Sequence, residues 1–351
     1  MFGWVTKIKA VFGFKSAGLQ GKKSKRRRQE SLNIKSIDFE SFAMMGESSK
    51  KHDCQDTICI FDTYSDSFYF FGILDGHGSS GREVSNHASE RLQKHLESNK
   101  NTIKNFKNDK QRENFLRKMY LKTDKELKKS GIDIQMSGTT CISIFIQNNI
   151  LYISNVGDSR AVLGRVTENE KYAIELSQDH TPLIPHERDR IIKSGGTIQK
   201  MFHRGEYTGP YRVWADEEGP GIAMTRSLGD FSGKKIGLIA SPEIQHLEIK
   251  EYDKFVVCAS DGIWDVMTST EVVAFLLRLG ERKGSAEELV KEARSRWRDL
   301  NLCKKKNREV PGFPDIRSGI DDISVVVAYF NYEDDQEVNL EDNKVFKFVR
   351  F

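Results

Sequence analysis

The sequence predicts an α+β fold built on antiparallel sheets. Runs rich in β-branched and aromatic residues occur near the front, in the middle and at the end of the chain, and helical patterns fall mostly in pairs between them. This order differs from the strand–helix alternation that is typical of a parallel sheet. Because no Pro/Gly/Ser-rich linker interrupts residues 37–332, we expect one continuous domain there, with a basic N-terminal arm over 1–36 and a short tail over 333–351.

Helices are predicted where apolar residues recur at helical spacing or where capping residues stand. One such helix has an apolar residue at every fourth position, which would lay a stripe on the core: Val84, Ala88, Leu92 and Leu96. A second is predicted over 109–129, and shorter ones after Pro185 and over 270–279. Ser285, with Glu288 three residues later, predicts a capping box at the start of another helix.

Runs of β-branched residues predict a hairpin and a final strand. The hairpin joins strands over 141–146 and 150–156 through the short turn Gln147-Asn148-Asn149. The final strand is predicted over 323–330. These strands lie between helical segments rather than after each one, which again favours antiparallel pairing.

Two further apolar runs end on the same dipeptide. Asp75-Gly76 follows the run 68–74, and Asp261-Gly262 follows the run 255–260. A carboxylate at the end of a buried strand is strongly destabilising unless a cation meets it, and the Gly lets the backbone turn sharply beside a bound group. Because Asp-Gly is also a common turn pair, these two sites alone favour metal binding no more than they favour ordinary turns.

Acidic residues at two more strand ends strengthen the metal hypothesis. Asp321-Asp322 stands just before the final strand, and Asp56 precedes a predicted strand over 57–61. Several carboxylates that converge would repel one another unless cations were present. Mg²⁺ and Mn²⁺ prefer such oxygen ligands, and paired cations roughly 4 Å apart are a known arrangement for hydrolysing phosphate esters.

The composition limits the class of protein. Of the 351 residues, 38% are hydrophobic and 30% are charged, and no apolar run approaches the roughly 18 residues that a spanning helix needs. The five cysteines are odd in number, scattered, and without a secretory signal, which argues against a disulfide framework. We therefore expect a soluble globular protein of a reducing compartment, in the cytoplasm, the nucleus or both.

Positive charge is concentrated in the arm. Residues 1–28 hold nine Lys or Arg and no Asp or Glu, so the net charge of +4 leaves about −5 for the remainder once these nine are subtracted. Apolar residues among the first fifteen, and the run Lys22-Lys23-Ser24-Lys25-Arg26-Arg27-Arg28, predict either a peripheral membrane contact or a nuclear import signal. A solvated tail without a partner is the alternative.

Nine short motifs occur in order between about residues 51 and 330. They are Lys51-His52-Asp53-Cys54-Gln55-Asp56, Asp75-Gly76-His77-Gly78, Ser137-Gly138-Thr139-Thr140, Gly157-Asp158-Ser159-Arg160-Ala161, Gln178-Asp179-His180, Ala223-Met224-Thr225-Arg226-Ser227-Leu228-Gly229-Asp230, Pro242-Glu243, Ser260-Asp261-Gly262-Ile263-Trp264-Asp265 and Asp321-Asp322-Ile323-Ser324. Each motif alone is weak evidence, but nine in sequence are very specific. Together they resemble the metal-dependent Ser/Thr protein phosphatases of type 2C. The stretch Arg212-Val213-Trp214-Ala215-Asp216 looks most like the plant and protist branches of that family.

The resemblance implies a fold and a metal centre. The implied fold is a central sandwich of two antiparallel sheets flanked by helix pairs, in four layers. The implied cofactors are two Mg²⁺ or Mn²⁺ ions, and a shared water that they activate would attack the phosphorus of phosphoserine or phosphothreonine. By position, Asp75 would bridge both ions, the Gly76 carbonyl would hold one of them, and Asp261 and Asp321 would hold the other.

The resemblance also implies roles for five more residues. Asp56 would act on the metals mainly through bound waters, and Asp158 and Asp265 would form a weaker third metal site. His77, beside the bridging position, would protonate the departing oxygen as general acid. Lys51 stands where much of the family has an Arg to clamp phosphate, and a Lys ammonium would hold phosphate without the bidentate fork.

Other activities fit the sequence less well. None of the five cysteines has an Arg six residues later, as a cysteine-dependent phosphatase requires, and no glycine-rich nucleotide loop is present. A catalytically silent phosphatase-like regulator would be expected to lose metal carboxylates, and a two-metal nuclease would need positive charge in its cleft rather than in an arm. We therefore expect phosphoprotein substrates, a monomer, and no nucleic acid in catalysis.

Overall fold

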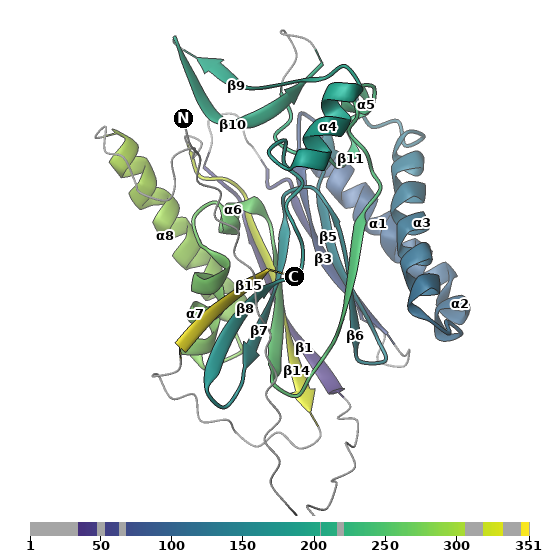
Figure 1. The fold of residues 1–351 in the computed structure, drawn as a ribbon, viewed down its shortest axis with the longest axis vertical. Helices are drawn as coiled ribbons and strands as arrows, with labels where there is room; N and C mark the ends of the chain where they lie inside the picture. The colour runs from purple at the N-terminus through teal and green to yellow at the C-terminus, as the bar shows by residue number, and fades with distance from the viewer. Residues whose placement is uncertain are drawn as a thin grey trace, which may run out of the picture. The chain divides into compact units, whose positions relative to one another are not determined.

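Two β-sheets form the centre of the fold (Figure 1). The computed structural model describes residues 34–47, 53–62, 68–203, 205–215, 221–305, 319–332 and 345–350. Side chains from both sheets meet in one apolar cluster, in which Phe71, Ile73 and Ile144 of one sheet share the interior with Val256 and Val326 of the other. This shared layer is the centre of the predicted sandwich.

The first sheet has six strands. Their order across the sheet is β1 (Ile34–Met44), β14 (Ile323–Tyr332), β13 (Asp253–Ala259), β7 (Arg160–Val166), β8 (Glu170–Glu175) and β15 (Val345–Arg350). Neighbouring strands pair antiparallel except β15, which runs parallel to β8. The prediction of an antiparallel sheet therefore holds for every pair of this sheet but the last.

The second sheet has seven strands. Six follow the order β11 (Leu228–Gly229), β4 (Gly138–Thr139), β3 (Tyr69–His77), β5 (Cys141–Gln147), β6 (Ile150–Val156) and β12 (Glu243–Glu248), and β2 (Asp56–Asp62) also pairs with β3. The predicted hairpin is β5–β6. Its turn needs two residues with positive φ, and Asn148 and Asn149 supply φ values of 54° and 60°.

Helices cover the outer face of each sheet, as Figure 1 shows. On the seven-stranded sheet, α1 (Gly81–Ser98) packs on β2, β3 and α3 (Asp109–Leu127), with the short α2 (Lys100–Lys104) between the helices. The four apolar residues of the predicted stripe are fully buried there. On the six-stranded sheet lie α7 (Ser269–Leu279) and α8 (Ser285–Lys305). The predicted α+β fold with helix-flanked sheets is confirmed.

One helix start differs from the prediction. Ser285 is the first residue of α8, and its hydroxyl accepts a hydrogen bond from the Tyr329 hydroxyl (2.9 Å) instead of capping the helix. The prediction of a capping box at Ser285 is therefore wrong. The box lies at α7, where Thr268 Oγ1 accepts from the Glu271 backbone N–H (3.3 Å) and Glu271 Oε2 accepts from the Thr268 backbone N–H (2.8 Å).

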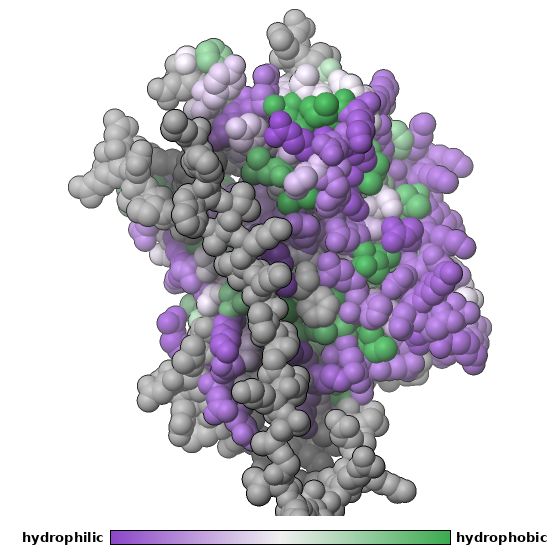
Figure 2. Space-filling view, in the orientation of Figure 1, coloured by the Kyte–Doolittle hydropathy of each residue, from purple (hydrophilic) through white to green (hydrophobic). Residues whose placement is uncertain are grey.

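A smaller group of elements consists of α4 (Pro185–Lys193), the hairpin of β9 (Thr197–His203) and β10 (Glu206–Trp214), and the short helix α5 (Phe231–Lys234). Its own apolar cluster contains Ile191, Val213 and Leu238. The hairpin also exposes two aromatic rings, Phe202 and Tyr207, whose centroids lie 5.1 Å apart. Figure 2 shows a mainly hydrophilic surface on this face of the molecule, with hydrophobic residues in small groups, one of them at the top over α4.

The strand β15 lies within the predicted C-terminal tail and closes one edge of the six-stranded sheet. Besides the backbone pairing with β8, Lys347 forms an ion pair with Glu170 (2.5 Å) and Arg350 Nε donates to Glu175 Oε2 (2.7 Å). The Lys347 pair is largely exposed and contributes little, whereas the Glu175 carboxylate is buried, so the edge is stabilised by the Arg350 contact, the backbone hydrogen bonds and the covering of the sheet edge.

Deleting residues 345–351 is expected to lower the free energy of unfolding by about 1–3 kcal/mol, because several backbone hydrogen bonds are lost together. Urea denaturation with a chelator present measures this. As the control, Lys347→Ala, which removes only the exposed ion pair, should cost less than about 1 kcal/mol. An unchanged denaturation midpoint for the truncated chain would show that β15 adds nothing to the sheet.

Candidate active site

The first two predicted metal ligands face each other across a strand pair. β2 and β3 pair antiparallel, and their register places Asp56 directly opposite Asp75. Asp75 is fixed by its backbone, which donates to Thr140 Oγ1 (3.1 Å) and accepts from the Thr140 N–H (2.9 Å). Like charges directly opposite each other destabilise a sheet, so this register is unfavourable unless something compensates the two carboxylates.

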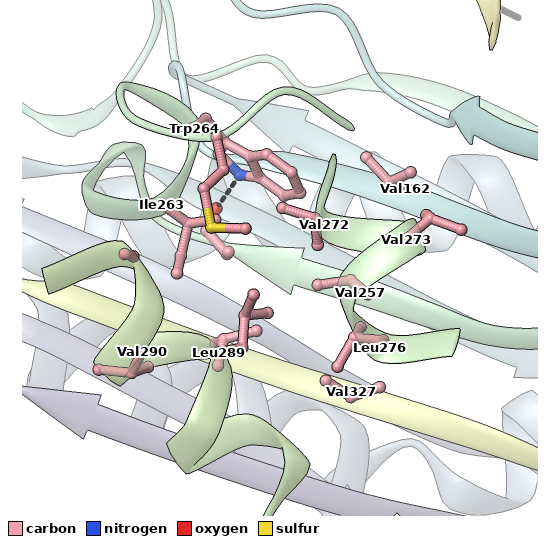
Figure 3. Packing of buried hydrophobic residues seen from close by; sticks show 14 of the residues in the cluster. Val162, Val257, Ile263, Trp264, Val272, Val273, Leu276, Leu289, Val290 and Val327 are labelled. Carbon is pink, nitrogen blue, oxygen red and sulfur yellow. Dashed lines mark hydrogen bonds between the residues drawn. The ribbon is translucent and has the colours of Figure 1, made fainter. Parts of the chain in front are cut away.

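Asp261 is brought to the same place by a short helix. It is the first residue of α6 (Asp261–Trp264), which follows the end of β13. Figure 3 shows how Ile263 and Trp264 anchor this helix among buried residues of α7, α8 and the sheet. The Trp264 indole N–H donates to the Ala259 carbonyl (2.8 Å), and the Trp297 indole N–H of α8 donates to the Gly262 carbonyl (2.8 Å). These contacts fix the backbone that carries Asp261.

The two glycines after these aspartates are required by space. A Cβ at Gly262 would lie 2.0 Å from the Asp322 carbonyl oxygen, and one at Gly76 would lie 2.6 Å from the Gln55 carbonyl oxygen. Neither glycine is among the residues with positive φ. These two positions therefore need glycine because neighbouring backbone segments approach closely, and not because the chain turns sharply there, as the sequence predicted.

Asp321 and Asp322 make different hydrogen bonds. Asp322 is buried and ties three segments together, because Oδ1 accepts from the Gly46 N–H (2.8 Å) and Oδ2 accepts from the Gln55 N–H (2.9 Å). Asp321 Oδ1 accepts from the Asp322 backbone N–H (2.9 Å). Asp322 thus holds the segment before Asp56 against the segment that carries Asp321.

The carboxylates act on one another strongly. Burial raises the pKa of Asp75 well above its usual value, and the charges of Asp56, Asp261, Asp321 and Asp158 raise it further. Burial likewise raises the pKa of Asp56 to about 7, with the charges of Asp322 and Asp321 adding to the effect. The charges of four other predicted ligands, from four different parts of the chain, therefore act on Asp75.

The donor set fits hard divalent cations by its chemistry. Both carboxylate oxygens of Asp56 are buried, and neither has a hydrogen-bond partner of normal geometry. Buried anions in this number are stabilised only by positive charge, and oxygen ligands are those that Mg²⁺ and Mn²⁺ prefer. Within the part of the chain that the structure describes, however, no three His, Cys, Asp or Glu side chains have the spacing of a completed metal site.

The remaining predicted residues lie in different surroundings. Asp265 ends α6 and faces Arg160, whose guanidinium lies over the Trp264 ring (5.2 Å). Burial lowers the pKa of Arg160, but the charges of Asp179, Glu175 and Asp265 raise it overall. The charge of Asp158, the other predicted ligand of the third metal site, raises the pKa of Asp75. Lys51, the predicted phosphate clamp, lies outside the described residues.

His77 is held by an aspartate, Asp230, that is not among the predicted site residues. Its Nε2 lies 2.7 Å from Asp230 Oδ2, and the Asp230 side chain is fully buried while the His77 side chain is 26% exposed. Asp230 ends one of the nine motifs, and from the sequence alone we interpret it as a residue that organises a loop. The only sequence feature that points to Asp230 is the Gly229-Asp230 pair, and this pair does not indicate which side chain the carboxylate contacts.

A family model decides the class of protein. The model described as Protein phosphatase 2C matches residues 40–300, which is most of the chain. The chain belongs to the protein phosphatase 2C family. The family predicted from the nine motifs is thereby confirmed, and metal dependence is general in this family.

Relatives of this phosphatase and solved structures agree with the family. "Probable protein phosphatase 2C 65" of Arabidopsis thaliana is 33% identical over 308 residues, covering 83% of this chain and 76% of the relative. "Probable protein phosphatase 2C 34" of the same plant is 34% identical, with coverages of 83% and 80%. The crystal structure of serine-threonine phosphatase 2C from Toxoplasma gondii superposes with a TM-score of 0.70 at 20% identity, covering 85% of this chain and 96% of that one, which supports the fold.

Proposed function

We propose that this chain hydrolyses phosphoserine and phosphothreonine in phosphoproteins, with divalent cations held by the carboxylates around Asp75. Its membership in a family of metal-dependent Ser/Thr protein phosphatases supports the reaction. The observation that supports the proposal is the strand register that sets Asp56 opposite Asp75, together with the charges of Asp158, Asp261 and Asp321, which also raise the pKa of Asp75. Carboxylates that raise one another's pKa in this way are costly to keep ionised without a cation.

The proposed ligands are those that the sequence selected. Asp75 would bridge two Mg²⁺ or Mn²⁺ ions, with the Gly76 carbonyl on one ion and Asp261 and Asp321 on the other. Asp56 would bind through water, and Asp158 and Asp265 would hold a weaker third ion. When bound, such a pair of cations supplies the Lewis acidity that activates water near neutral pH and neutralises charge on the phosphoryl group.

The other steps belong to side chains of this chain. His77 would give its proton to the serine or threonine oxygen as the P–O bond breaks, because an alkoxide is a poor leaving group without protonation. Lys51 would contribute positive charge to the bound phosphate. Asp322 keeps the segments of Asp56 and Asp321 together through its two backbone hydrogen bonds, so it supports the site without being a proposed ligand.

Phosphate release from a phosphothreonine peptide tests the proposal. We expect turnover with Mn²⁺, none with excess chelator, and at least about a 100-fold loss in Asp261→Asn. Asp189→Asn, an exposed change of the same chemistry in α4, is the matched control and should leave turnover unchanged. Activity that survives both chelation and Asp261→Asn would contradict the metal mechanism. No turnover with any cation would favour a silent regulatory domain instead.

The location and assembly of the protein complete the proposal. No helix among the described residues is both long and apolar enough to cross a membrane. We propose a monomer that acts on phosphoproteins of the cytoplasm or nucleus. The basic arm over residues 1–28 lies outside the described residues, and its contact with a membrane surface or with nuclear import receptors stays a prediction from its charge.

A further inference from the structure

Asp230 is placed against His77 by a constrained piece of backbone. It is one of few non-glycine residues with positive φ among those described, at 49°, a conformation that L-residues adopt uncommonly. Its backbone N–H donates to the Ser137 carbonyl (3.0 Å), and its carbonyl accepts from the Lys234 N–H (3.1 Å). A strained position that the surrounding hydrogen bonds maintain is a reason to look for function at its side chain.

The Asp230 carboxylate is buried and charged. Oδ2 accepts from the Ser227 hydroxyl (2.6 Å) as well as meeting His77 Nε2 (2.7 Å). Burial alone would raise the pKa of Asp230, but His77, Ser227 and Lys234 together hold it below its usual value. An ionised carboxylate can only accept hydrogen bonds, so the hydrogen between the two side chains belongs to Nε2.

This contact determines the orientation of the imidazole. With Nε2–H directed at a fixed carboxylate, the ring cannot rotate freely, and Nδ1, which is buried in this structure, is the nitrogen that would carry a transferable proton. A buried aspartate performs the same task for the histidine in hydrolases that use a serine nucleophile, where it fixes the tautomer without being protonated itself. A carboxylate can orient an imidazole in this way whatever the nucleophile is, so the same contact can orient a histidine that serves as a general acid.

We propose that Asp230 is a positioning residue that holds His77 in the tautomer and orientation needed to protonate the departing serine or threonine oxygen. The inference rests on the proposed function and deepens it. In the step concerned, water adds its oxygen to phosphorus and the P–O bond to the side chain breaks. The departing oxygen takes the proton of His77, which gives an alcohol and inorganic phosphate, and His77 regains a proton from solvent.

Asp230→Asn tests the proposal, because the amide keeps the shape of the side chain and removes its charge. Two substrates are compared with Mn²⁺ present: a phosphothreonine peptide, whose alkoxide needs a proton, and p-nitrophenyl phosphate, whose phenolate leaves without one. We expect kcat on the peptide to fall by about 10²-fold or more, as when a general acid is lost, with a much smaller fall on the aryl phosphate. The ratio of the two losses is the readout.

A double-mutant cycle with His77→Gln separates positioning from general damage. If Asp230 acts through His77, Asp230→Asn should change the substrate ratio by about 10²-fold in the unaltered chain and by almost nothing in the His77→Gln background. Asp124→Asn is the matched control. Asp124 is a buried carboxylate that holds the same loop, through the Gly229 N–H (3.0 Å) and Lys234 Nζ (2.9 Å), and its change should leave the substrate ratio as it was.

The outcomes are distinguishable. Equal losses on both substrates in Asp230→Asn, or additive effects in the cycle, would overturn the positioning role. An unchanged ratio in His77→Gln itself would instead refute the proposed general acid. Should Asp230→Asn not fold, the unaltered protein with Mg²⁺ gives the answer by ¹⁵N NMR of its histidines. We expect neutral His77 to carry its hydrogen on Nε2, and an Nδ1–H tautomer would contradict the proposal.

Discussion

The Asp75→Asn variant is expected to lose at least about 100-fold of its phosphatase activity and yet to be more stable than the unaltered chain when no divalent cation is present. Burial and the charges of Asp56, Asp261, Asp321 and Asp158 all disfavour an ionised Asp75. A neutral amide removes this repulsion and can donate to the neighbouring carboxylates. The unfolding temperature in chelator should rise by about 2–4 °C for each kcal/mol of repulsion relieved.

Added Mn²⁺ should make the unaltered chain more stable than Asp75→Asn. The cation binds the folded chain and stabilises it in proportion to its affinity, and the variant lacks the proposed bridging ligand. Melting curves with and without Mn²⁺ would therefore show a large upward shift for the unaltered chain and a small one for Asp75→Asn. Equal shifts in the two proteins would mean that Asp75 does not bind the cation, whatever happens to activity.

Glu187→Gln is expected to destabilise the protein by about 3–5 kcal/mol, the usual cost of breaking a buried ion pair from one side. Glu187 lies in the first turn of α4 with no solvent exposure. Its carboxylate accepts from both Arg190 (2.6 and 2.9 Å) and Arg226 (2.6 and 3.0 Å), and from the Thr225 hydroxyl (2.5 Å). Removing the charge leaves two partly buried guanidinium groups without their shared partner.

The pH dependence of this effect follows from the sign of the shift. Burial alone would raise the pKa of Glu187, but Arg190, Arg226 and Thr225 outweigh it and hold the pKa far below the usual 4.5. The stabilisation is therefore complete above about pH 4.5 and is lost as the pH falls through the lowered value. The difference in unfolding free energy between the unaltered chain and Glu187→Gln should be constant near neutral pH and shrink in acid.

Glu287→Gln supplies the comparison for Glu187. It removes a carboxylate of α8 that is 46% exposed and pairs with Lys291 at 2.9 Å. Exposed helical pairs contribute about 0.3–0.5 kcal/mol, so urea denaturation should barely distinguish this variant from the unaltered chain. A cost for Glu187→Gln no greater than that for Glu287→Gln would show that the Arg190 and Arg226 contacts are not stabilising in solution.

Local patterns explain what could be predicted from the sequence. The apolar stripe of α1 and the Asn148-Asn149 turn depend on neighbours within a few residues, and both occur where expected. The aspartates at strand ends could be selected because burial makes an uncompensated carboxylate costly wherever the strands lie. That they converge on Asp75 came from the family resemblance rather than from any spacing in the chain.

Contacts between distant residues explain what could not be predicted. His77 and Asp230 are 153 residues apart, and no periodicity links them. Asp322 looked equivalent to Asp321, but its hydrogen bonds to Gly46 and Gln55 depend on the packed fold. The box predicted at Ser285 is absent because α8 begins at Ser285 itself, one residue too early for this side chain to be the N-cap, and its hydroxyl accepts from Tyr329 of another element. Sequence patterns report which hydrogen bonds form between residues that are close in the chain. The contacts of Asp230, Asp322 and Ser285 are with residues that are distant in the chain.

The pairing order of the two sheets has a consequence for how the chain folds as it is synthesised. Every strand of the seven-stranded sheet lies between residues 56 and 248, whereas the six-stranded sheet needs β1 at 34–44 to pair with β14 at 323–332. Chains emerge from the ribosome amino end first, and distant pairings form slowly. The seven-stranded sheet can thus assemble during translation, while β1 of the six-stranded sheet stays without its partner until β14 has been synthesised.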